Sequence, residues 1–163
     1  MAVTPDRFRD ALRFWASGVT VLTTRRTGGI QGITVSSFAS LSLEPPLVLA
    51  CIARKAVSHD RIGAERAFAV NILADTQRVL ADLAAGRSGA EGNRLEGIPW
   101  HAEKTGAPVL DGCLAWVDCT LQEALPGGDH AIFVGRVEAA GQREGKPLLW
   151  FGSGYRSIGR RVP

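Results

Sequence analysis

The chain has 163 residues, of which 45% are hydrophobic and 21% charged, so it can bury a sizeable core and is expected to form one domain over residues 1–163. Nineteen basic and sixteen acidic side chains give a net charge of +3, which is too mild to indicate nucleic-acid binding. No apolar run approaches the roughly 20 residues of a membrane span, and charged residues break up the N-terminal segment where a signal peptide would lie. We therefore expect no membrane partner and a cytoplasmic location.

The N-terminal part of the chain is predicted to contain one helix followed by strands. The helix is expected over residues 4–17, with Thr4 as N-cap and Gly18 as the stop signal. Apolar side chains from Phe8 to Trp15 recur at helical spacing, so the helix is expected to pack against another surface. Three strand-like segments then predict a β-meander: residues 19–24, 30–40 and 47–53.

The second half of the chain is predicted to be mainly strand. Short helices are expected near Ser58 and Asp75, and residues 86–97 form a long Gly-rich loop that we interpret as a lid or a dimer contact. Further strands are expected at residues 67–73, 113–125, 130–142 and 147–159. At least six strands with few helices predict a closed antiparallel barrel in which full pairing removes exposed edges.

The three cysteines are expected to be reduced and buried. Cys51, Cys113 and Cys119 each lie in an apolar stretch, and the chain has no CxxC or Cys/His cluster that would indicate structural zinc. On one strand, Cys113 and Cys119 would be about 20 Å apart, which is too far for a disulfide. We therefore expect no metal site.

One strand carries hydroxyl groups where a core strand would carry branched aliphatic side chains. This strand runs through residues 32–40. It is the notable feature of the sequence because the common dinucleotide, phosphate-loop, metalloprotease and hydrolase motifs are absent. The hydroxyls and the accessible backbone could satisfy the edge of a flat polar heterocycle. The alternative is a strand whose serines face solvent.

Two further groups could contact a nucleotide. Arg54, Lys55 and Ser58 lie where a strand ends and a helix begins, a plausible phosphate seat, although a solvated turn with a Ser N-cap has the same pattern. The lone loop residue Arg94 could add a contact to an anion.

Two aromatic side chains could approach a ligand. His130 follows a tight turn at the start of a strand, where Asp129 could orient its ring. Tyr155 and Arg156 offer an aromatic face beside a guanidinium group, which suits a nucleotide phosphate.

Five segments, taken in chain order from about Phe8 to Ile158, resemble the flavin reductase-like family of FMN-binding split-barrel reductases: FRDALRFWASGVTVLTT, GITVSSFASLSLEPPLVLACIA, FAVNIL, GDH and GSGY. The SFxSLSLxPPLVL run after a GVTVLTT strand is the longest and most specific of these matches. The resemblance implies a mainly β protein, a homodimeric six-stranded antiparallel split barrel with flanking helices, in which a second subunit completes the site. It also implies binding of FMN or FAD and oxidation of NADH or NADPH, with reduced flavin supplied to a partner monooxygenase.

The resemblance also implies roles for individual residues. The flavin ring and ribityl chain would be lined by Thr34, Val35, Ser36, Ser37 and Phe38, with Cys51, Ile52 and Ala53 across the barrel edge. The flavin phosphate would be held by Ser58 with Arg54 or Lys55, and Arg94 would approach from the loop. His130, Tyr155 and Arg156 would face the nicotinamide nucleotide.

The predicted reaction is hydride transfer from nicotinamide C4 to flavin N5, with the protein supplying alignment. His130 is assigned to nicotinamide positioning, and a general-acid role is the alternative. A competing hypothesis is a flavin-binding electron-transfer or redox-sensor protein that does not turn over on the same barrel. A third hypothesis is an oligonucleotide-binding barrel, but the sequence lacks the interleaved basic and aromatic residues that binding to single strands requires.

Overall fold

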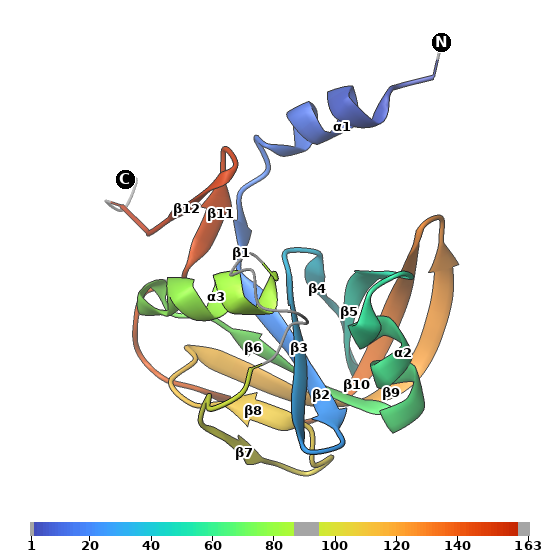
Figure 1. Cartoon of the computed structure of the whole chain (residues 1–163), viewed down its shortest axis with the longest axis vertical. Coiled ribbons are helices and arrows are strands. Elements are labelled where there is room, and N and C mark those ends of the chain that lie inside the picture. Colours follow the sequence, from blue (N-terminus) through green and yellow to red (C-terminus); the bar gives the residue numbers. More distant parts are fainter. Residues whose placement is uncertain (1, 87–94, 160–163) are drawn as a thin grey trace.

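Seven antiparallel strands form the main sheet of the computed structural model, which describes residues 2–86 and 95–159 (Figure 1). They are β2 (Thr20–Arg26), β3 (Gly29–Val35), β4 (Phe38–Leu43), β5 (Pro46–Ala53), β6 (Ala67–Ile72), β9 (Ala115–Gly127) and β10 (His130–Gln142). Their order in the sheet is β3-β2-β6-β9-β10-β5-β4. Alternate side chains of these strands, among them Leu22, Phe68 and Phe133, point inward and form the largest core cluster.

The sheet is a barrel with one open seam. Its edge strands are β3 and β4, and within the described residues no ladder joins them. The expectation of a mainly β antiparallel fold is confirmed. The expected pairing of every strand on both sides is wrong, because β3 and β4 are edge strands. The expected simple meander is also wrong, because the β2–β3 hairpin is joined in the sheet by β6 and not by β4. The predicted strand at 30–40 is divided at Ser36 and Ser37, where the chain leaves one edge and begins the other.

Short helices and two small sheets surround the main sheet. The helices are α2 (Val57–Glu65), the 3-10 turn η1 (Asp75–Gln77) and α3 (Arg78–Ala84). One small sheet contains β1 (Ser17–Gly18), β11 (Leu149–Phe151) and β12 (Gly154–Arg156), and the other contains β7 (Trp100–Ala102) and β8 (Pro108–Leu110). The β7–β8 hairpin was not predicted from the sequence. Of the helices in residues 2–86 and 95–159, none is long and apolar enough to cross a membrane.

The N-terminal helix α1 (Pro5–Leu12) extends away from the barrel (Figure 1). Its predicted cap is confirmed, since the Thr4 hydroxyl accepts a hydrogen bond from the amide of Arg7. The helix ends at Leu12, five residues before the predicted end, and none of its residues is buried. The expected packing partner is therefore absent from the described chain, and Phe8 and Trp15 remain 58% and 72% exposed.

All three cysteines are free thiols, as predicted. Cys113 and Cys119 are buried, while Cys51 is half-buried. Burial raises the pKa of Cys119 to about 12, so this thiol stays protonated and unreactive at neutral pH. Cys119 therefore serves as a small apolar core residue.

Candidate functional site

The open seam between β3 and β4 brings together two of the predicted flavin-lining segments. The Ser37 hydroxyl donates to the carbonyl of Cys51 at 2.9 Å and accepts from its amide at 3.1 Å. One side chain thus joins the β3–β4 corner to the end of β5 with both its donor and its acceptor capacity. Ser37 holds the wall of the site in place, and its hydroxyl is already used.

The other members of the hydroxyl strand have different surroundings. Thr34 donates to the carbonyl of Ala81 at 2.7 Å, which fixes α3 over the end of β3. Val35 is buried in the core, and Phe38 packs against that core. Ser36 is exposed at the corner. Among residues 34–38, its hydroxyl is the one that the structure presents at the surface without a described hydrogen bond to the protein.

A small cavity lies beside this corner, and we call it the inner cavity. Its volume is about 180 Å³. It combines the polar edge of β3 with an apolar and aromatic wall from β11, β12 and the end of α3. The lining residues are Val19, Thr34, Val35, Ser36, Ala85, Trp150 and Tyr155.

The predicted phosphate seat differs from the expectation. Arg54 and Lys55 are exposed after the end of β5, but Ser58 is only 1% exposed and its hydroxyl lies 3.3 Å from the Gln31 amide nitrogen, which donates to it. Helix α2 begins at Val57, with Ala56 rather than Ser58 at its N-cap. Ser58 therefore faces the core beneath the helix, and its hydroxyl is not presented to an external phosphate.

Asp129 and His130 lie beside the same basic residues. His130 is paired with Ala53 across β10 and β5, and Arg54 donates its amide to the Asp129 carbonyl and its Nε to the His130 carbonyl. The predicted orientation of His130 by Asp129 is present, with His130 Nδ1 2.7 Å from Asp129 Oδ1. This hydrogen bond lowers the pKa of the Asp129 carboxyl, which therefore stays ionised at neutral pH.

Tyr155 is held between α3 and the β11–β12 hairpin. Its hydroxyl donates to Asp82 at 2.8 Å, and its ring meets Trp150 edge-on with centroids 5.1 Å apart. The guanidinium of Arg78 lies over the same ring, 5.4 Å from its centre. Neighbours on three sides therefore fix the orientation of this aromatic side chain.

The predicted site residues thus form two groups. One contains the end of β5 and the tip of the β9–β10 hairpin with His130, and the other contains β12 with Tyr155 and Arg156. In Figure 1 these lie on opposite sides of β3 and β4, so a single chain does not bring His130 and Tyr155 together. Ile52, near the end of β5, is buried in the core, and Arg94 lies outside the described residues.

The comparisons with known proteins agree with this architecture. The model of the family described as "Flavin reductase like domain" matches residues 12–159. The chain belongs to the flavin reductase-like family. The family prediction made from the sequence is confirmed.

Two curated relatives in this family carry reductase names. The reductase subunit HsaB of a flavin-dependent monooxygenase from Rhodococcus jostii is 39% identical over 158 residues, which cover 96% of this chain and 80% of HsaB. The FMN reductase (NADH) SmoA from Agrobacterium fabrum is 37% identical over 94% of this chain and 86% of its own length. These names agree with the predicted enzyme class.

Solved structures of the family confirm the fold. The flavin reductase PheA2 superposes with a TM-score of 0.89 at 35% identity, over 97% of this chain and all of that one. The NADH:FAD oxidoreductase SgcE6 from Streptomyces globisporus gives 0.88 at 32% identity, over 100% and 94% of the two chains. The predicted split barrel is therefore correct.

Sequence reasoning missed several residues around Tyr155. Trp150 lines the inner cavity, and Arg78 and Asp82 surround the Tyr155 ring. Arg78 and Asp82 are four positions apart, the spacing that places two side chains on one face of a helix. That signal was present in the sequence, but it does not show what the face contacts.

Proposed function

We propose that this chain is an NADH-dependent flavin reductase that releases reduced flavin to a separate monooxygenase. The inner cavity at the β3–β4 corner carries the proposal, because it lies among the residues that family resemblance assigns to flavin. NADH is favoured because two relatives, SmoA and a flavin reductase from Rhodococcus, carry NADH in their names. A monooxygenase partner is favoured by HsaB and by the reductase component of a trigonelline monooxygenase.

The residues of the inner cavity fit a flavin. Its flat ring needs a polar contact along one edge and apolar contact on its faces, which a pocket of mixed lining supplies. Ser36 and the β3 backbone form the polar edge, while Val19 and Trp150 form apolar walls. The exposed Arg54 and Lys55 beyond Cys51 would hold the phosphate, in place of the buried Ser58.

The protein's contribution to the reaction is binding and alignment. A bound flavin supplies hydride-accepting chemistry, and no side chain has to act as a nucleophile. Ser36 offers a hydroxyl donor at the corner, and Ser37 keeps that corner against β5. His130, oriented by Asp129, is proposed to position the nicotinamide.

NADH oxidation is expected to depend on added flavin, with a rate that saturates as FMN or FAD is raised, because an exchanging flavin behaves as a substrate. Steady-state loss of NADH absorbance, measured with flavin-depleted protein, checks this. A rate independent of flavin concentration would instead support the alternative of a tightly bound, electron-transferring flavoprotein.

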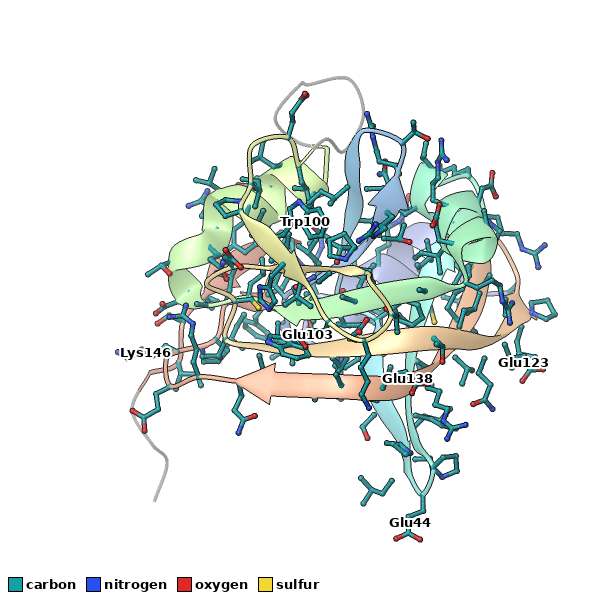
Figure 2. All side chains as sticks on the ribbon, turned by 90° about the horizontal axis from the view of Figure 1, so that it is seen from below. Glu44, Trp100, Glu103, Glu123, Glu138 and Lys146 are labelled. Carbon is teal, nitrogen blue, oxygen red and sulfur yellow. The ribbon has the colours of Figure 1, made fainter. Side chains whose placement is uncertain are left out.

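We also propose that the chain works as a homodimer. Two apolar projections support this. One is the N-terminal segment, with Phe8 on α1 and Trp15 just after it, and the other is the β4–β5 hairpin, whose Leu43 is 85% exposed. Figure 2 shows Glu44 at the tip of that hairpin, away from the rest of the molecule. Exposed apolar surface of this kind marks protein–protein contact, and a second copy would bring His130 and Tyr155 from different chains to one site.

The expected mass in solution is about 35 kDa, twice the 17.4 kDa of one chain. Replacing both Phe8 and Trp15 by serine is expected to shift light scattering toward the monomer and to reduce activity with it. Val79→Ser is the matched control, because Val79 is as exposed as Trp15 but lies on α3. A fully active wild-type monomer would refute the proposed dimer.

A further inference from the structure

Helix α3 accepts hydrogen bonds from two side chains that line the inner cavity, Thr34 on β3 and Tyr155 on β12. The Thr34 hydroxyl donates to the carbonyl of Ala81 at 2.7 Å. The Tyr155 hydroxyl donates to Oδ1 of Asp82 at 2.8 Å. Because Ala81 and Asp82 are consecutive, one turn of α3 connects the two walls of the cavity. Asp82 is the side chain in this connection, since the acceptor for Thr34 is a backbone carbonyl.

Strand β12 depends on such a contact for its position. It is a three-residue edge strand of a small sheet, and within the described chain it pairs with β11 alone. The Trp150 ring, which meets Tyr155 edge-on, belongs to the same short hairpin. From α3, the Arg78 guanidinium lies over the Tyr155 ring, but the Arg78 side chain is 70% exposed. A hydrogen bond to a carboxylate is stronger than an exposed cation–π contact, so Asp82 supplies the firmer link.

Open space lies on the other side of the Tyr155 ring. A cleft of about 630 Å³ shares Trp150 and Tyr155 with the inner cavity, so these two rings form the wall between the two hollows. A Tyr155 side chain released from Asp82 has room to turn into the cleft. The inner cavity would then lose one of its aromatic walls.

We propose that Asp82 is a positioning residue for flavin binding, because its carboxylate holds Tyr155 in place as a wall of the inner cavity. This inference rests on the proposed function, which seats the flavin ring in that cavity. A wall that is fixed before binding loses little conformational freedom when the ring enters. Asp82 itself acts through Tyr155 and does not line the inner cavity.

Asp82→Leu removes the acceptor at similar side-chain volume and is expected to raise the KM for FMN about tenfold. The kcat at saturating FMN is expected to stay nearly unchanged, because the wall contacts the flavin equally before and during hydride transfer. Asp82→Asn keeps an oxygen acceptor without the charge, so its KM should rise less. A variant that only reduced the amount of folded protein would lower kcat at an unchanged KM.

Tyr155→Phe tests the other end of the same hydrogen bond, since it removes the donor and keeps the ring. It should raise the KM for FMN by a factor similar to that of Asp82→Leu, and the double variant should be no worse than either single variant. Asp111→Leu is the matched control. Asp111 is also a half-exposed carboxylate beside an aromatic side chain, with Oδ1 2.8 Å from His101 Nδ1, and its loss should leave the KM for FMN unchanged.

Tyr155 is the one tyrosine of the sequence, so protein labelled with 3-fluorotyrosine gives a single ¹⁹F resonance. Asp82→Leu is expected to move this resonance toward its position in the unfolded chain. Titration with FMN, followed at the same resonance, gives a Kd without turnover, which should be about tenfold higher in the variant. An unchanged Kd for FMN, or additive effects in the double variant, would overturn the inference. If the variant bound FMN more weakly as expected but the wild type did not oxidise NADH, the proposed function alone would fail.

Discussion

Replacing His130 by alanine is expected to lower kcat/KM for NADH about a hundredfold while leaving the KM for flavin nearly unchanged. His130 begins β10, and its Nδ1 lies 2.7 Å from Asp129 Oδ1, so its loss removes a pre-positioned contact. Hydride transfer depends steeply on alignment, and a misplacement of about 1 Å can cost a hundredfold. Steady-state kinetics with NADH and flavin varied in turn measures both constants.

The chain contains a matched control for this variant. His101 is 48% exposed and its Nδ1 lies 2.8 Å from Asp111, while the His130 side chain is 45% exposed. His101→Ala is therefore expected to leave all kinetic constants unchanged. Asp129→Asn keeps an oxygen acceptor for His130 and should retain most of the activity. If His130→Ala weakened flavin and spared NADH, His130 would belong to the flavin site.

Replacing Phe68 by alanine is expected to lower the free energy of unfolding by about 3–5 kcal/mol. Phe68 is fully buried on β6, in the centre of the main core cluster. Urea unfolding at a fixed protein concentration measures the change, because a dimer's stability depends on that concentration. Phe151→Ala, at a ring that is 38% exposed, should cost roughly 1 kcal/mol or less. Equal losses in the two variants would contradict this account of the core.

Gly135 on β10 packs closely against the Phe68 ring, so a substitution at Gly135 tests the packing around that ring. A methyl group added at Gly135 on β10 would collide with Cζ of Phe68 and approach Cβ of Cys119 to 3.0 Å. Gly135→Ala alone is thus expected to destabilise by about 1–3 kcal/mol through overpacking. Combined with Phe68→Ala, it should cost less than the sum of the two, because the cavity accepts the methyl group.

Some elements could be predicted because their signals are local. The Thr4 cap and the strand over residues 130–142 agree with the structure, the latter residue for residue. Alternating apolar residues and a turn glycine act over neighbouring positions, so they can be recognised without knowing the fold. The SFxSLSLxPPLVL segment similarly identified the family before any geometry was known.

The remaining features depend on contacts between distant parts of the chain. The sequence pattern predicts Ser58 at an exposed helix start. In the structure Ser58 is buried, and its hydroxyl accepts a hydrogen bond from Gln31, which lies 27 residues earlier in the chain. Tyr155 is oriented by Asp82, 73 residues away, and the helical pattern of α1 predicts a partner that residues 2–86 and 95–159 do not supply. Periodicity and capping therefore determined which segments form helices and strands, and motif likeness determined the family. Only the tertiary structure decided which hydroxyls and guanidinium groups reach the surface of a cavity, because that depends on strand register and on packing between residues far apart in sequence.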